Sequence, residues 1–330
     1  MSFAIRIHQT GGPDVLRWEE VGAGETASLA PNEARVRHEA VGLNFIDIYH
    51  RTGLYPLPLP SGIGLEGAGI VEAVGSAVTE ATDIRVGDRV AYAGGPIGAY
   101  AEVRNIPADR LVKLPDAIDC KTAAAMMLQG MTAQYLLRRT YQVQPGDTIL
   151  IQAAAGGVGL IVCQWAKALG ATVIGTVSSD EKAALAKAHG CDHPIVYTRE
   201  NFVERVKEIT GGAGVPVVYD SIGKDTFTGS LDCLRPLGMM VTFGNASGPV
   251  PPVDTLELSK RGSLFLTRPT LFTYIAQRAD LVQTAQDLFD VVSSGKVKIE
   301  VNQTYALKDA AQAHIDLAAR KTTGSTVLLP

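Results

Sequence analysis

A glycine-rich turn between an apolar strand and a helix constrains this chain more than any other feature. Residues 148–152 (TILIQ) are typical of a short strand, and the small residues 153–159 (AAAGGVG) follow it. An apolar helical pattern then runs from Leu160 to Gly170, and residues 172–177 predict a second strand. Such a unit is typical of a dinucleotide site, because backbone N–H groups and the helix N-terminus face a phosphate there. In the alternative interpretation the glycines only allow close packing of helix on sheet.

The pattern of apolar segments predicts two kinds of structure along the chain. Short alternating runs separated by glycine and proline turns dominate residues 1–128 and predict a β-rich, barrel-like domain. From residue 129 to 267 apolar strands alternate with helical patterns, which predicts a parallel, doubly wound α/β sheet. The strands expected there are 148–152, 172–177, 193–196, 215–220, 239–244 and 263–267. An amphipathic helix over 281–292, ending near Gly295, begins the remaining segment, 268–330.

Composition excludes several classes of function. The formal net charge of −4 argues against a large surface for nucleic acid, so nucleic-acid binding is not expected. No stretch approaches the roughly 20 apolar residues of a membrane span, and residues 1–6 do not resemble a signal peptide. The four cysteines have no C-x-x-C spacing, which fits the reducing cytoplasm. We therefore expect a cytoplasmic enzyme with no membrane partner.

Several motifs along the chain resemble those of one known family. They are Gly42-Leu43-Asn44-Phe45-Ile46-Asp47-Ile48-Tyr49, Gly67-Ala68-Gly69-Ile70-Val71, Gly146-Asp147, Ala154-Ala155-Gly156-Gly157-Val158-Gly159 and Thr267-Arg268-Pro269. On these residues the chain resembles, over nearly its whole length, the quinone oxidoreductase/ζ-crystallin family of the zinc-free medium-chain dehydrogenase/reductases. It is most similar to the bacterial NADPH:quinone reductases of that family.

The resemblance implies two domains and a dimer. A GroES-like, β-rich catalytic domain would comprise residues 1–128 and 268–330, and a Rossmann NADPH-binding domain would comprise residues 129–267. In the family the cofactor lies in the cleft between the two domains. Relatives also pair the edges of their Rossmann sheets, so the apolar strand 263–267 predicts a homodimer. In the alternative interpretation this strand is buried inside the sheet.

The end of the second predicted strand bears on the choice of cofactor. NAD sites place an acidic residue there to bind the ribose hydroxyls, and Val177 occupies that position here. Ser178 and Lys182 follow and predict a site for the 2′-phosphate of NADPH. Asp180 is the rival, because it could bind the ribose of NAD. The resemblance adds Tyr197 as a further phosphate contact.

The residues that hold zinc in related alcohol dehydrogenases are not present. Leu65, within Gly64-Leu65-Glu66, stands where those relatives have a histidine, and Asn44 stands where they have a cysteine. The region around Gln129 offers no third cysteine, and a four-cysteine zinc lobe is missing from the sequence. We therefore expect no bound metal, and an acceptor that needs no Lewis acid.

The remaining site residues are implied by the resemblance. Asn44 and Tyr49 would lie near the nicotinamide, Tyr55 near the acceptor, and Arg268 toward the cofactor and the cleft, and these four are the candidate catalytic residues. The glycine turn would bind the pyrophosphate through Ala155, Gly156, Gly157, Val158 and Gly159. Further cofactor contacts would come from Thr132, Ser221, Phe243, Gly244, Asn245, Ala246 and Arg320.

Three functions remain open at this point. The first is an NADPH-dependent quinone reductase, which transfers a hydride or single electrons to an acceptor stacked on the nicotinamide. The second is an NADPH-dependent reductase of enones or alkenals. The third is a non-catalytic, NADPH-binding protein of the crystallin type, some relatives of which bind RNA.

Overall fold

The computed structural model describes residues 2–22, 28–78 and 82–330. The chain forms two compact units. One comprises Met1–Met131, Tyr274–Ser293 and Ile299–Pro330, and the other comprises Thr132–Thr273 and Ser294–Lys298. We call them the β-rich unit and the parallel-sheet unit. In the part of the chain that the structure describes, no helix is long and apolar enough to cross a membrane.

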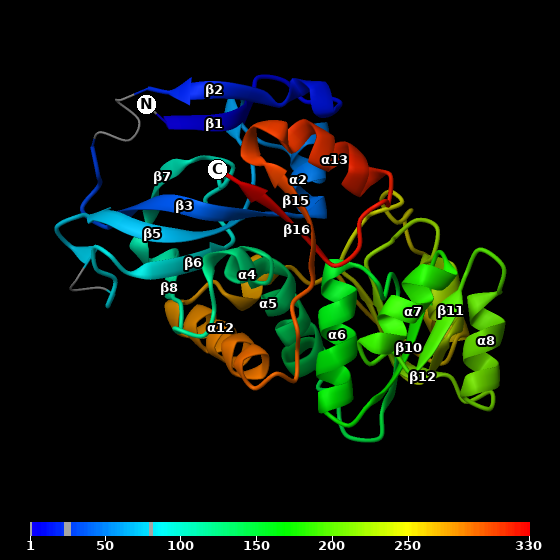
Figure 1. The fold of residues 1–330 in the computed structure, drawn as a ribbon. Coiled ribbons are helices and arrows are strands. Elements are labelled where there is room, and N and C mark those ends of the chain that lie inside the picture. Colours follow the sequence, from blue (N-terminus) through cyan, green and yellow to red (C-terminus); the bar gives the residue numbers. More distant parts are fainter. Residues whose placement is uncertain (1, 23–27, 79–81) are drawn as a thin grey trace. The chain divides into compact units, whose positions relative to one another are not determined.

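The β-rich unit is built on two sheets (Figure 1). The smaller has the strand order β2-β1-β4 and contains β1 (Ser2–Ile7), β2 (Arg17–Val21) and β4 (Ser61–Gly62). The larger has the order β15-β16-β3-β5-β6-β8, with β7 also paired to β3. Its strands are β3 (Glu33–Leu43), β5 (Glu66–Val74), β6 (Arg89–Ala93), β7 (Val103–Pro107), β8 (Val112–Lys113), β15 (Val301–Ala306) and β16 (Ser325–Leu329).

Strand β3 shows how the sequence pattern forms this unit. Ala34 and Val36 are fully buried while their neighbours are partly or largely exposed, as alternation predicts for a strand with one face in the core. The last residues, Ala40 to Leu43, are all buried. Ala34, Val36, Val41 and Leu43 join one hydrophobic core with residues from β1, β5, β6 and α13 (Ala310–Ala318). The end of β3 is therefore a rigid base for the segment that follows it.

Helices and single turns complete the β-rich unit. They are η1 (Pro13–Val15), α2 (Phe45–Thr52), η2 (Ala108–Arg110), α4 (Cys120–Ala124), α12 (Arg278–Ser293), η4 (Leu307–Asp309) and α13 (Ala310–Ala318). Helix α5 (Met127–Tyr135) spans the boundary between the units. The prediction of a mostly β domain did not include α2. Leu288 of α12, within the expected amphipathic helix, packs directly on Gly130 of α5.

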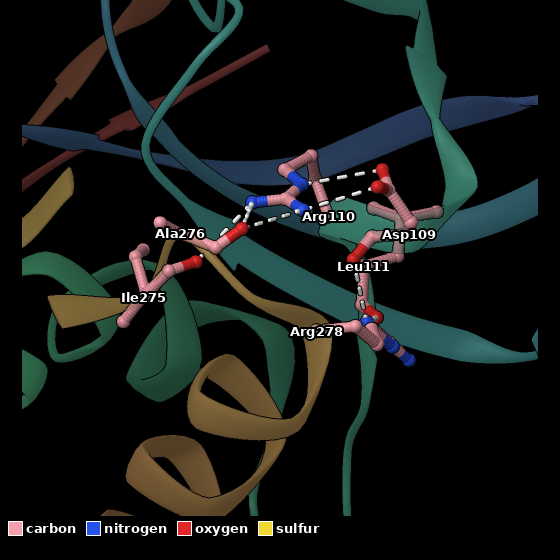
Figure 2. A network of polar contacts seen from close by, with 6 residues as sticks. All are labelled: Asp109, Arg110, Leu111, Ile275, Ala276 and Arg278. Carbon is pink, nitrogen blue, oxygen red and sulfur yellow. Dashed lines mark hydrogen bonds and ion pairs between the residues drawn. The ribbon is translucent and has the colours of Figure 1, made fainter. Parts of the chain in front are cut away.

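Two arginines fasten the start of α12 and the residues before it to η2 and the residue after it (Figure 2). Arg110 donates to the carbonyl oxygens of Ile275 (3.3 Å) and Ala276 (3.4 Å), and it pairs with Asp109 beside it. Arg278 donates to the carbonyl oxygens of Asp109 (2.9 Å) and of Leu111. These contacts join segments more than 160 residues apart in the sequence, so they fix where the chain re-enters the β-rich unit.

The parallel-sheet unit has six strands in the order β11-β10-β9-β12-β13-β14, all parallel. They are β9 (Thr148–Ile151), β10 (Thr172–Val177), β11 (His193–Val196), β12 (Val215–Asp220), β13 (Leu234–Thr242) and β14 (Phe265–Thr267). The helices are the π-helix η3 (Leu136–Thr140), α6 (Gly157–Ala168), α7 (Asp180–Ala188), α8 (Phe202–Ile209), α9 (Phe227–Asp232), α10 (Leu256–Lys260) and α11 (Leu271–Tyr274), the last of which reaches the unit boundary.

This unit confirms the expected doubly wound α/β class, with corrections at the strand ends. Three strands, β10, β11 and β12, have the predicted limits. Strand β9 ends at Ile151 rather than Gln152, and β14 begins at Phe265 rather than Ser263. Strand β13 begins at Leu234 and ends at Thr242, before Gly244. Its pairing with β12 shifts register between Val215 and Val217, an irregularity that the apolar pattern does not reveal.

Candidate functional site

The strand order of the parallel sheet reverses between β9 and β12. From β9 the chain adds β10 and β11 on one side, and from β12 it adds β13 and β14 on the other. In open α/β sheets, ligands bind at the carboxyl ends of the strands near such a switch point. Most of the predicted cofactor residues follow the carboxyl ends of these six strands. They are Ala155–Gly159, Ser178 and Lys182, Tyr197, Ser221, Phe243–Ala246, and Arg268.

The glycine turn lies directly at the switch point. Gly156 precedes α6 in an extended conformation, and no described side chain caps the helix N-terminus there. Gly159 lies close to the preceding backbone, because a Cβ at this position would lie 2.3 Å from the carbonyl oxygen of Ala153. Ala153 itself has φ of 58°, in the left-handed region. The turn is therefore tightly wound, and it presents the first N–H groups of α6 to an anion.

A buried polar network holds the strand ends around this turn. Gln152 accepts a hydrogen bond from Thr176 (2.5 Å) and donates to Ser230 (3.0 Å). Ser230 donates to Asp220 (2.8 Å), which also accepts from Thr226 (2.7 Å). The network connects β9, β10, β12 and α9. Asp220 also accepts from the N–H groups of Ile222 (2.8 Å) and Gly223 (3.0 Å), which forms an Asx turn. The sequence analysis did not identify this network.

The loops after β12 and β13 lie against each other. Phe243 N donates to the carbonyl oxygen of Asp220 (2.8 Å), and Ala246 N donates to that of Ser221 (3.2 Å). A Cβ at Gly244 would lie 2.5 Å from the Ser221 carbonyl oxygen, so only glycine allows this approach. The structure thus brings Ser221 together with the segment from Phe243 to Ala246.

The loops after β10 and β11 are also joined. Tyr197 N donates to the carbonyl oxygen of Val177 (3.1 Å), and the Thr198 hydroxyl donates to that of Ser178 (3.2 Å). Ser179, not Ser178, caps helix α7 by accepting from Lys182 N (3.3 Å). The Tyr197 side chain is 40% exposed. Ser178, Lys182 and Tyr197 therefore belong to one cluster of loops at the carboxyl edge.

Asp180, the rival candidate for a ribose contact, is in an ion pair. Arg199, two residues beyond Tyr197, donates to both of its carboxylate oxygens, at 2.7 Å and 2.5 Å. These hydrogen bonds lower the pKa of Asp180 below its usual range, so the carboxyl is ionised. The sequence analysis did not consider Arg199.

Arg268, Thr132 and Arg320 lie in three separate places. Arg268 follows the edge strand β14 and is exposed. Thr132 is buried on α5. Arg320 follows α13 in the β-rich unit, exposed and with φ of 59°. Cys163 is fully buried on α6.

In the β-rich unit, Asn44 lies between the end of β3 and α2. Its N–H donates to Asp47 (2.8 Å), the reciprocal contact of a capping box. Its carboxamide donates from Nδ2 to Glu66 (2.7 Å) and accepts at Oδ1 from Gln129 (3.2 Å). Ser325 in turn donates to Gln129 (2.7 Å). The amide of Asn44 is thus held in one orientation by buried partners.

Two of these partners are buried carboxyl groups. Burial raises the pKa of Glu66 to about 8, against the opposing effect of hydrogen bonds from Asn44 and the Leu128 N–H. Burial likewise raises the pKa of Asp47 to about 7, against hydrogen bonds from Asn44 and Tyr100. Asp47 thus holds the Asn44 N–H and the Tyr100 hydroxyl in place.

A directed chain of hydrogen bonds leads from Asp47 to the far end of α2. Arg51 can only donate, so Nδ1 of His314 accepts its hydrogen bond (3.1 Å). Burial and nearby Arg51 lower the pKa of His314 to about 3, so the ring is neutral and carries its proton on Nε2. This proton points to the Tyr100 oxygen (3.1 Å), and the Tyr100 hydroxyl donates to Asp47 (2.9 Å). Helix α2 is thereby tied to α13 at both ends.

Aromatic rings line one side of α2. Tyr49 is buried, and its ring meets that of Tyr55 edge-on with centroids 5.2 Å apart. The ring centroids of Phe45 and Tyr49 are 6.3 Å apart, and those of His50 and Tyr55 are 6.0 Å apart. Tyr55 N also donates to the carbonyl oxygen of Tyr49 (3.1 Å). The structure brings Tyr49 and Tyr55 together, in the same unit as Asn44.

Within residues 2–22, 28–78 and 82–330, no group of three or more His, Cys, Asp or Glu side chains is arranged to hold a metal ion. The expectation of a metal-free enzyme stays a prediction, since it concerns the protein in solution. Chemically, the glycine turn and the loops beside it suit a phosphate-bearing dinucleotide: they combine N–H donors at a helix N-terminus with hydroxyls and a lysine.

Comparison with known proteins identifies the family. Residues 30–116 match the alcohol dehydrogenase GroES-like domain, and residues 157–292 match the zinc-binding dehydrogenase family. A quinone oxidoreductase of Pseudomonas aeruginosa is 56% identical over the full length of both chains. The chain belongs to the quinone oxidoreductase family of the medium-chain dehydrogenase/reductases. The predicted GroES-like and Rossmann fold is thereby confirmed.

Two further members of the family bear on function. The crystal structure of Escherichia coli quinone oxidoreductase complexed with NADPH superposes with a TM-score of 0.96 at 51% identity, and the match covers 99% of this chain and 100% of that one. A 2-haloacrylate reductase of Burkholderia is 50% identical over 100% of this chain and 99% of its own.

Proposed function

We propose that this protein is an NADPH-dependent quinone reductase. The observation that carries the proposal is the convergence of the glycine turn and five other loops at the carboxyl edge of one parallel sheet. The quinone oxidoreductases of Pseudomonas aeruginosa and Escherichia coli, the second of them crystallised with NADPH, support the choice of cofactor and acceptor.

The residues of each unit have distinct tasks in this proposal. NADPH supplies the hydride when it is bound. The N–H groups of Gly157, Val158 and Gly159 hold its pyrophosphate, and Ser178, Lys182 and Tyr197 hold its 2′-phosphate. The other cofactor contacts that the family resemblance implies come from Ser221, Phe243–Ala246, Thr132, Arg268 and Arg320. Asn44, Tyr49 and Tyr55 orient the nicotinamide and the acceptor.

The buried network explains how Asn44 would act. Its Oδ1 and one Nδ2 hydrogen are committed to Gln129 and Glu66, which leaves the second Nδ2 hydrogen in a fixed direction. A donor fixed in advance costs no reorganisation when charge develops on an oxygen. Quinones and conjugated carbonyls suit such a site, because their reduced forms delocalise charge and need only hydrogen-bond donors.

A second candidate is the reduction of activated alkenes. The 2-haloacrylate reductase, half of whose residues are identical, is named for a substrate with a conjugated carbon–carbon double bond. An enone reductase would use the same cofactor residues and the same donors toward the carbonyl oxygen.

One assay distinguishes these functions. NADPH oxidation is followed with 1,4-benzoquinone, 9,10-phenanthrenequinone, an enone and 2-chloroacrylate as separate acceptors. Turnover of the quinones supports the proposal, and turnover confined to the enone or the haloacrylate would replace it with the second candidate. NADPH binding without turnover of any acceptor would favour a non-catalytic binding protein.

We further propose a homodimer formed through β14. This strand lies at one edge of the six-stranded sheet, and its Phe265 and Leu266 are 57% and 36% exposed. Such an edge offers unpaired backbone groups and apolar side chains to a second copy. Sedimentation equilibrium should give twice the chain mass of 34.9 kDa, and Phe265→Glu should shift it toward one chain. A wild-type mass of one chain would refute the dimer.

The cytoplasm is the proposed location. All four cysteines are buried and free of disulfides, which fits a reducing compartment. Fractionation of cells that express the native protein should recover it with cytosolic markers, and recovery in a membrane or secreted fraction would contradict the proposal.

A further inference from the structure

A carboxylate lies close to the position where an NAD-type site would place its acid, a position that Val177 occupies here. Asp180 begins helix α7, three residues after the end of β10, and its side chain is 70% exposed. An unpaired carboxylate at the end of the second strand accepts hydrogen bonds from ribose hydroxyls and repels a 2′-phosphate. By its position alone, Asp180 therefore opposes the use of NADPH.

Arg199 changes the character of that carboxylate. Its two terminal nitrogens donate to the two oxygens of Asp180, at 2.7 Å and 2.5 Å, in the bidentate geometry that suits a guanidinium and a carboxylate. The pair occupies both oxygens and cancels the charge. Lysine could cancel the charge but could not engage both oxygens in this way.

The position of Arg199 follows from the way the two loops are joined. Arg199 comes directly after Thr198, whose hydroxyl donates to the carbonyl oxygen of Ser178 (3.2 Å). Tyr197 N donates to the carbonyl oxygen of Val177 (3.1 Å). The segment after β11 is thus fixed on the end of β10, beside the residues proposed to hold the 2′-phosphate.

We propose that Arg199 is a determinant of cofactor specificity, which neutralises Asp180 and thereby admits a nucleotide with a 2′-phosphate at the ends of β10 and β11. The inference rests on the proposed function, because it assumes that NADPH binds at this edge. The two side chains are more than half exposed, and exposed ion pairs contribute little to stability. Substitution should therefore change binding while the fold is retained.

The test compares single and double variants in nucleotide binding. Dissociation constants for NADPH and NADH are measured by fluorescence titration at low salt for the wild type, Arg199→Gln, Asp180→Asn and the double variant. Arg199→Gln should weaken NADPH binding by about tenfold, the effect of one unscreened like charge near a phosphate, while NADH binding stays the same or tightens. Asp180→Asn should leave NADPH binding within about twofold, and adding it to Arg199→Gln should restore most of the loss.

Arg37→Gln is the matched control. Arg37 forms an exposed ion pair with Glu72 (3.1 Å) in the β-rich unit, so this variant has the same change in net charge outside the loops after β10 and β11. It should bind both nucleotides like the wild type.

Three outcomes would overturn the inference. They are equal losses for NADPH and NADH in Arg199→Gln, no recovery in the double variant, and a loss in Arg37→Gln as large as that in Arg199→Gln. NADPH binding with the expected pattern but without quinone turnover would support the inference and refute only the proposed function. Failure of the wild type to bind either nucleotide would overturn both.

Discussion

The hydroxyl of Tyr100 is the central link in the chain of hydrogen bonds that holds α2. It donates to Asp47 (2.9 Å) and lies 3.1 Å from Nε2 of His314. All three residues are at least 99% buried, so water cannot replace a lost partner. Tyr100→Phe removes this one oxygen and retains the ring. The substitution therefore measures what the chain contributes to stability.

The size of the effect follows from the two contacts that are lost. A hydrogen bond to a charged group contributes about 1.5–3 kcal/mol, and a buried donor without an acceptor costs about 1–3 kcal/mol. The first value applies to the hydrogen bond from Tyr100 to Asp47, and the second applies to the N–H of His314, which would lose its acceptor. Because the two contacts share one oxygen, their effects are not independent. We expect the free energy of unfolding at neutral to basic pH to fall by about 3 kcal/mol.

The loss should grow with pH. Burial raises the folded-state pKa of Asp47 from 3.8 to about 7, so the stability that this group contributes is full below about 4 and is lost as the pH rises through 7. The hydrogen bond from Tyr100 acts in the opposite direction and holds this pKa down. Without it the folded-state pKa rises further, and the loss continues to higher pH. Tyr100→Phe should therefore be more destabilising at pH 9 than at pH 5.

Urea unfolding at pH 5 and pH 9 gives the measurement. The control is Tyr305→Phe, since the Tyr305 hydroxyl also donates to an aspartate, Asp316 (2.9 Å), but is only half-buried. Its loss should cost less than about 1 kcal/mol at either pH. Equal losses for the two variants, or a penalty for Tyr100→Phe that shrinks as the pH rises, would refute the reasoning.

Three further predictions concern the cofactor and the metal. Gly159→Ala places a Cβ 2.3 Å from the Ala153 carbonyl oxygen and should weaken NADPH binding at least about tenfold. In Gly156→Ala the added Cβ lies 3.3 Å from the same oxygen, so NADPH binding should weaken much less. Equal dissociation constants for the two variants in fluorescence titrations would contradict this. Lys182→Ala should raise the dissociation constant of NADPH about tenfold more than that of NADH, and equal losses would be inconsistent with a contact to the 2′-phosphate. Dialysis against EDTA should leave quinone turnover unchanged, and elemental analysis should find no stoichiometric zinc; recovery of a lost activity on adding zinc would disprove this.

The arrangement of the parallel sheet could be predicted because its signal is local. Each strand is a short apolar run, and the turn after β9 combines small residues with a helix start. The ends of β13 could not be predicted, because its register shift depends on pairing with β12 rather than on its own composition. The same local signal placed Ser178 and Lys182 after β10, whereas Tyr197, after the neighbouring strand β11, came from the family resemblance.

Long-range contacts between polar side chains could not be predicted. Tyr100 and His314 are 214 residues apart, and neither has a neighbour in the sequence that indicates its partner. The contact of Arg199 with Asp180 spans only 19 residues, but it depends on how the loops after β10 and β11 meet. The sequence thus identified Asp180 as a residue that could bind the ribose of NAD, but it did not indicate the arginine that pairs with Asp180.

The residues at the positions of the zinc ligands of related dehydrogenases explain which acceptors suit this site. Asn44, at the cysteine position, hydrogen-bonds to Gln129 and to Glu66, and Leu65 replaces the histidine. Neutral amides are poor substitutes for thiolate and imidazole as zinc ligands, and here the amide oxygens already accept hydrogen bonds, that of Asn44 from Gln129 and that of Gln129 from Ser325. The same network that makes Asn44 a poor ligand makes it a rigid hydrogen-bond donor. A fixed donor stabilises developing charge less than a metal ion does, so the acceptor must itself delocalise the electrons it receives, as quinones and conjugated alkenes do.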